Sequence, residues 1–169
     1  GDWRTVYFGN GATGTLEHTE IRYAGNVFSP GSPSGDNIGA IEIYGDATIN
    51  ATELAITNSD TWGIHSDSAG ASTIINGGRV SGSRYSLIYV ENGSVTGTGL
   101  ALVDGDSGVW VGATNASGNI TNSRFDNITN NAFQNQSTDF NNAVATGNYW
   151  GHPLGPFDDA DADGRSNLN

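Results

Sequence analysis

A repeat of about 23 residues is the feature of this sequence that most constrains its fold. Short apolar segments recur along the chain, and after the first copy they start at intervals of 23, 24, 21 and 23 residues. These starts are Ile41, Ile64, Ile88, Val109 and Ala132. An earlier copy starts at Val6, and the longer gap to Ile41 contains a turn-rich insertion over residues 26–37. Without that insertion the interval returns to the repeat length.

Each repeat also contains a second pair of apolar residues that are five positions apart. The pairs are Leu16/Ile21, Ile49/Leu54, Ile75/Val80, Val95/Leu100 and Ile120/Phe125. Gly, Asn, Asp and Ser fill the intervening positions and suit tight corners, while no segment has the apolar spacing of a helix. Equivalent residues of successive repeats are expected to stack about 4.8 Å apart. The sequence therefore predicts an all-β fold, a single-stranded right-handed parallel β-helix of about six coils.

Two terminal motifs carry a family resemblance. The opening pattern W..V.F..GATG.LEH.EIRYAG and the closing NYWGHPLGP (residues 148–156) resemble those of secreted bacterial and archaeal β-helix repeat proteins of the pectate-lyase-like superfold. This resemblance implies a secreted or cell-surface location. It does not settle function, because lyases, hydrolases, epimerases and adhesive stalks share this fold. The domain expectation is a β-helix over residues 1–157, followed by an acidic tail or linker over 158–169.

Composition limits the partners. The formal net charge is −12, with six Lys and Arg residues in total, so a nucleic-acid partner is not expected. No apolar run has the roughly 20 residues of a membrane span. There is no cysteine, so neither disulfides nor thiol chemistry contribute. The chain starts with Gly1 rather than Met, and we interpret it as a piece of a longer surface protein with neighbouring domains.

Strand alternation predicts which side chains point outward. If the first residue of each apolar segment faces the core, the next one faces outward, which gives a largely aromatic column. Flat aromatic faces stack on sugar rings, so the column is a candidate polysaccharide-binding surface. The competing interpretations are a stack that only stabilises the coils and a surface that a neighbouring domain covers. The candidate carbohydrate-binding residues are Tyr7, His65, Tyr89, Trp110 and Phe133.

A charged corner is the candidate for catalysis. Asp60, Arg84 and Asp106 occupy equivalent positions in successive coils, and Asp104 lies beside the last of them. Together with His65 they would form the acid, base and uronate-binding groups of a polysaccharide lyase or glycoside hydrolase. An exposed ion-pair ladder explains the same residues without catalysis.

The acidic tail contains half of a calcium-binding loop. Its carboxylates at Asp159, Asp161 and Asp163 precede a glycine, and the backbone carbonyl of Arg165 would be a further ligand. The position of the bidentate glutamate lies beyond the last residue, so we expect a structural calcium ion rather than a sensor. An acidic tail that binds no ion is the alternative.

Three functions remain open from the sequence. The first is a non-catalytic extracellular module for adhesion or polysaccharide binding, and the second is a carbohydrate-active lyase or hydrolase domain. The third is a structural spacer without a ligand. The sequence shows no complete catalytic set, which favours the first.

Overall fold

A computed structural model describes residues 4–25, 38–137 and 142–151 of the chain. The insertion 26–37 and the tail 158–169 lie outside the described residues. The described part confirms the all-β prediction, because its regular structure consists almost entirely of strands. The strands are β1 (Val6–Phe8), β2 (Thr13–Glu17), β3 (Glu20–Arg22), β4 (Ile41–Ile43), β5 (Thr48–Thr57), β6 (Ile64–Ser81), β7 (Ser86–Thr98), β8 (Ala101–Gly105), β9 (Ser107–Val111), β10 (Ala116–Thr121), β11 (Arg124–Ile128), β12 (Phe133–Asn135) and β13 (Ala143–Thr146).

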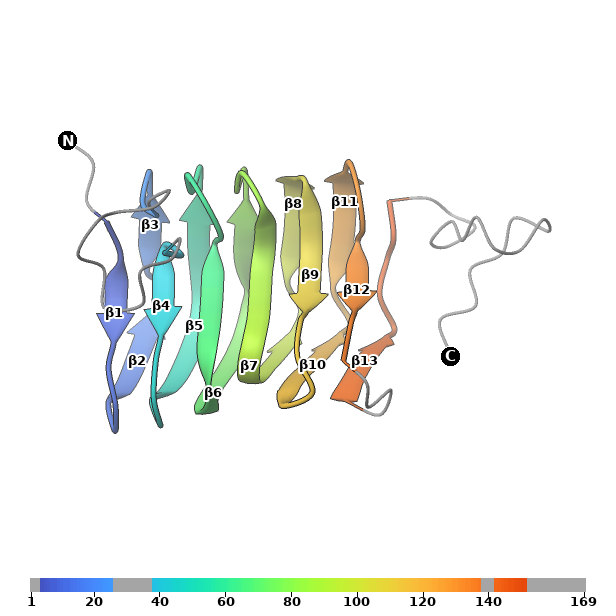
Figure 1. The fold of residues 1–169 in the computed structure, drawn as a ribbon. Helices are drawn as coiled ribbons and strands as arrows, with labels where there is room; N and C mark the ends of the chain where they lie inside the picture. The colour runs from blue at the N-terminus through green and yellow to red at the C-terminus, as the bar shows by residue number, and fades with distance from the viewer. Residues whose placement is uncertain (1–3, 26–37, 138–141, 152–169) are drawn as a thin grey trace.

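The strands wind into a parallel solenoid. In Figure 1, β1, β4, β9 and β12 run downward in front and β3, β8 and β11 run upward behind, while the coils advance from left to right. That sense of winding is right-handed, as predicted. The structure has about 4 turns, slightly fewer than the six predicted. The six-strand front ladder, β1–β4–β6–β7–β9–β12, includes the end strands β1 and β12 of three residues each.

The stacked coils enclose one apolar core. The strands described here pair in parallel, and Ile41 pairs with Ile64, which pairs with Ile88, which pairs with Val109. These four side chains are at most 1% exposed. Burying one such side chain contributes about 1.5–3 kcal/mol, but only when another coil covers it. A nearly constant repeat length is therefore required, because it places each core side chain next to the equivalent one of the following coil.

Two corners of each coil depend on residues with positive φ. Asn, Asp and Gly tolerate this left-handed conformation, and they occupy most of these positions. The corners lie five residues apart in each coil, so two columns of left-handed residues run along the solenoid. The first column is His18, Glu53, Gly77, Gly99 and Asn122; the second is Tyr23, Asn58, Gly82, Asp104 and Asn127.

The predicted five-residue apolar pairs are out of register in two coils. The observed ladder is Ile21, Ile56, Val80, Leu102 and Phe125. The sequence assigned Leu54 and Leu100 to this ladder. Both are buried, but they follow the left-handed residues Glu53 and Gly99 directly and fill the corner instead. Either leucine satisfies the same apolar pattern, which explains the error.

Candidate functional site

The outward column of the front ladder has largely the predicted composition. Parallel pairing places Tyr7 beside Glu42, Glu42 beside His65, His65 beside Tyr89, and Tyr89 beside Trp110. These residues alternate with core residues, so they leave the strands on the side away from the core. The column brings together four of the five predicted carbohydrate-binding residues.

Phe133 does not join this column. It pairs with Val109 and packs against the core, and Gln134 is the residue in register with Trp110. The sequence-based alignment paired Ala132 with Val109, one residue too early. The interval from Val109 to Phe133 is 24 residues, and a one-residue slip moves a side chain to the opposite face of the strand.

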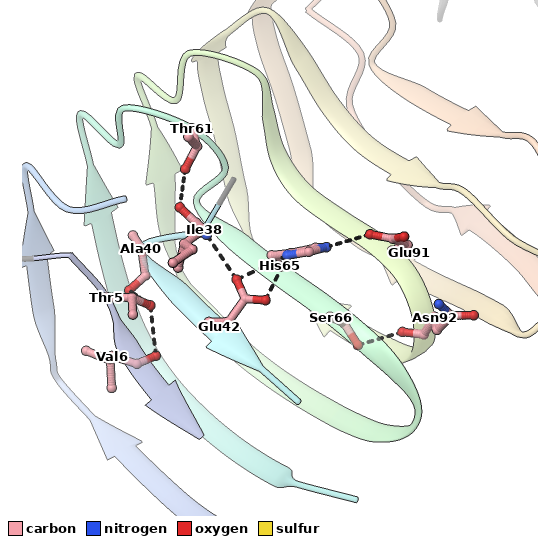
Figure 2. A network of polar contacts seen from close by, with 11 residues as sticks. Thr5, Val6, Ile38, Ala40, Glu42, Thr61, His65, Ser66, Glu91 and Asn92 are labelled. Atoms are coloured by element: carbon pink, nitrogen blue, oxygen red, sulfur yellow. Dashed lines mark hydrogen bonds and ion pairs between the residues drawn. The ribbon is translucent and has the colours of Figure 1, made fainter. Parts of the chain in front are cut away.

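His65 is the centre of a buried polar cluster. The side chains of His65 and Glu42 are 2% and 5% exposed. The His65 Nδ1 atom lies 2.9 Å from a carboxylate oxygen of Glu42, and Nε2 lies 3.1 Å from Oε2 of Glu91. Glu42 also accepts a hydrogen bond from the Gly39 backbone N–H at 3.0 Å. Figure 2 shows the imidazole held between the two carboxylates, one on β4 and the other on β7.

The two carboxylates determine the protonation of His65. Burial by itself lowers the pKa of the imidazole, but the hydrogen bonds to Glu42 and Glu91 and the negative charges of Glu42 and Asp67 outweigh it and raise that pKa to about 9. Reciprocally, the hydrogen bond from His65 lowers the pKa of Glu91 despite partial burial. At neutral pH His65 is therefore protonated, and both of its ring nitrogens donate hydrogen bonds.

Aromatic rings surround the cluster and extend it along the ladder. The His65 and Tyr89 rings are parallel within 1°, with centroids 5.1 Å apart, and Trp110 lies 4.8 Å beyond Tyr89. Trp62, two residues before the start of β6, packs against both, with ring centroids 4.4 Å from His65 and 5.0 Å from Tyr89. We call these four residues, Trp62, His65, Tyr89 and Trp110, the aromatic strip.

Burial, followed by the charges of Glu91 and Asp67, raises the pKa of Tyr89 to about 12. The phenol of the strip therefore stays neutral and is a hydrogen-bond donor throughout the physiological range. Tyr7 lies apart from the strip and stacks on Tyr44, with ring centroids 6.5 Å apart.

The residues proposed for catalysis do not converge with His65. Arg84 reaches Asp60 at 3.8 Å, while Asp104 pairs with Arg79 at 2.9 Å. Asp106 accepts hydrogen bonds from Ser107 and Thr129 at 3.3 and 3.5 Å. Within the described residues, the ion pairs of His65 are with Glu42 and Glu91 instead. The corner thus consists of separate, exposed pairs, each contributing up to about 1 kcal/mol.

The described residues contain one group with the chemistry of a metal site. The ligand atoms of His65, Asp67 and Glu91 lie within 4.8 Å of one another. The predicted calcium ligands Asp159, Asp161, Asp163 and Arg165 lie outside the described residues.

Sequence reasoning missed Glu42, Asp67 and Glu91 as partners of His65, and it missed Trp62. The alternation itself contained a signal, since Asp67 and Glu91 are the next outward positions after His65 and Tyr89. No repeat pattern marked Trp62.

No family model matches this chain, and no curated protein or solved structure shows a significant similarity to it. In the described part of the chain, no helix combines the length and the apolar character needed to cross a membrane.

Proposed function

We propose that this protein is a non-catalytic extracellular module that binds a polysaccharide along the outward face of the front ladder. The aromatic strip is the observation that carries the proposal. Tyr89 and Trp110, the half-buried rings of the strip, come from successive coils, so a sugar chain lying along the solenoid axis meets two platforms in succession. The resemblance to secreted β-helix repeat proteins supports the extracellular location and a place within a longer surface protein.

The charges beside the aromatic strip select the type of glycan. Asp67 and Glu91 lie close to His65 of the strip, and Glu42 and Glu91 hold its imidazole between them. A polyuronate would bring further negative charge to this face, which is unfavourable. Neutral hexose or pentose polymers are therefore the ligands that the surface suits.

A glycan array followed by calorimetry tests this proposal. Neutral polysaccharides are expected to bind and polygalacturonate is not. Replacing Trp110 with Ala removes one stacking platform, and an aromatic contact of about 1.4 kcal/mol corresponds to a roughly tenfold weaker affinity. Tyr149→Ala is the matched control, because Tyr149 is an exposed aromatic residue on the opposite ladder, beside Arg124. Equal binding by wild type and Trp110→Ala contradicts the proposal, as does a wild-type protein that binds no neutral glycan.

A carbohydrate-active enzyme is the second candidate. Asp67 and Glu91 place two carboxylate oxygens within 4.8 Å of each other, close to the spacing of about 5–5.5 Å in retaining glycosidases. His65 is too buried to reach a substrate, so Glu91, with 42% of its side chain exposed, is the residue that would act. New reducing ends or unsaturated products from a bound glycan would select this candidate, and intact glycan selects the binding module.

The proposal also includes a structural calcium ion in the tail, which rests on the amino-acid sequence alone. Four carboxylates over residues 158–163 would repel one another without a cation. Calcium would then stabilise the end of the solenoid. A chelator is expected to lower the melting temperature, and an unchanged temperature speaks against this role.

A further inference from the structure

We propose that His65, Asp67 and Glu91 bind a divalent transition-metal ion of the zinc type. This site is separate from the calcium loop of the tail, and it does not depend on glycan binding. Two of its ligand atoms, His65 Nε2 and Glu91 Oε2, are 3.1 Å apart. Tetrahedral zinc with bonds of about 2.0–2.2 Å places its ligand atoms about 3.4 Å apart. The pair therefore already has nearly the required spacing, and Asp67 completes the set within 4.8 Å.

Glu42 supplies the supporting contact that metal-binding histidines usually have. A ligating histidine commonly donates its other N–H to a carboxylate, which fixes the tautomer and the ring orientation. Here Nδ1 of His65 lies 2.9 Å from Glu42, whose side chain is 5% exposed and is itself held by the Gly39 N–H. With the proton on Nδ1, the Nε2 lone pair faces Glu91. The ion replaces the proton that Nε2 otherwise shares with Glu91, and that proton leaves to solvent.

The local charge and the ligand types favour such an ion over calcium. Glu42, Asp67 and Glu91 bring three carboxylates to one imidazole, and a divalent cation bound there reduces the repulsion among them. One imidazole nitrogen with two carboxylates suits zinc, cobalt or nickel, whereas calcium prefers oxygen ligands alone.

An unsatisfied donor lies beside the same cluster. Trp62 is 9% exposed, its ring is 4.4 Å from that of His65, and its Nε1–H has no hydrogen-bond partner among the protein groups. A buried donor without an acceptor costs about 1–3 kcal/mol. An oxygen held by an ion at His65 would be a suitable acceptor for this indole.

Titration of the chelator-treated full chain with Zn²⁺ and with Co²⁺, followed by calorimetry, tests the site. We expect one ion per chain bound with millimolar Ca²⁺ present, and a shift of the His65 Nε2 resonance in ¹⁵N NMR spectra. Glu91→Gln and Asp67→Asn are each expected to weaken binding at least tenfold. Glu42→Gln is expected to weaken it about 10–100-fold, the usual effect of losing such a supporting contact.

Asp126→Asn is the matched control, because Asp126 is a half-exposed, ion-paired carboxylate on the opposite ladder. Circular dichroism checks that each variant is folded, and Glu91→Gln is the primary variant because its side chain is partly exposed. The proposal is overturned if the wild type binds neither ion, or if binding persists at full strength in Glu91→Gln and Asp67→Asn.

Discussion

Raising the pH is expected to destabilise this protein through one buried residue. The pKa of His65 is about 9 in the folded chain, against an ordinary value of 6.5. Because the folded value is the higher one, the protonated imidazole stabilises the fold fully below pH 6.5, and this contribution is lost as the pH rises through 9. The difference of about 2.5 pKa units corresponds to about 3 kcal/mol at 1.36 kcal/mol per unit. The hydrogen bond between His65 and Glu91 already contributes to the raised pKa of His65, so its free energy is not added a second time.

The low-pH limit has the opposite sign. The pKa of Glu91 is lowered below 4.5 by its hydrogen bond with His65, so that contribution is present above pH 4.5 and is lost as the pH falls. The cluster is therefore expected to stabilise the fold most between pH 4.5 and 6.5.

Thermal melts of the chelator-treated protein at pH 6 and pH 10 measure the high-pH effect. For a chain of this size, 1 kcal/mol shifts the melting temperature by about 2–4 °C, so we expect a fall of about 6–12 °C. The reference is His65→Gln, which removes the titrating group and should lose much less stability over the same interval. An equal fall in both proteins, or none in the wild type, would refute this assignment of charge to His65.

Two further predictions concern the solenoid itself. Phe125→Ala is expected to cost about 3–5 kcal/mol, measured by urea unfolding, because this side chain is 1% exposed within the core ladder; a cost below 1 kcal/mol would contradict the packing. Gly78→Ala should destabilise more than Gly99→Ala, since at Gly78 the new Cβ would lie 2.2 Å from the Leu54 carbonyl oxygen, whereas at Gly99 the nearest atom is 3.9 Å away. Both glycines have positive φ, so equal losses would show that backbone conformation alone sets the cost.

The repeat length predicted the fold because the core can form only if equivalent residues recur at a nearly constant spacing. Each coil must place a buried residue above its predecessor, and Ile41, Ile64, Ile88 and Val109 meet that condition at nearly constant spacing. The alternation within strands then assigned Glu42, His65, Tyr89 and Trp110 to the outward column. These two periodicities are properties of the backbone and are visible in the sequence.

The details that failed depend on local changes in coil length. One extra residue before Phe133 moved it into the core ladder, and either Leu54 or Ile56 satisfied the same apolar pattern. The contact of Glu91 with His65 lies beside a register irregularity after Ser66. A pattern search has no means of locating a bulge whose position depends on how two coils pack.

Stacking in parallel register is the central claim, and a designed disulfide tests it most directly. The chain has no cysteine, and the exposed residues Ile74 and Thr96 are register partners on β6 and β7. Their Cα atoms should lie about 4.8 Å apart, within the range for a disulfide. Thr98 pairs with Asn76 instead, which places it about 8 Å from Ile74 and beyond that range. Under mild oxidation, mass spectrometry should show an intramolecular crosslink in Ile74→Cys/Thr96→Cys and little in Ile74→Cys/Thr98→Cys. No crosslink in the first variant, or equal yields in both, would contradict the parallel solenoid.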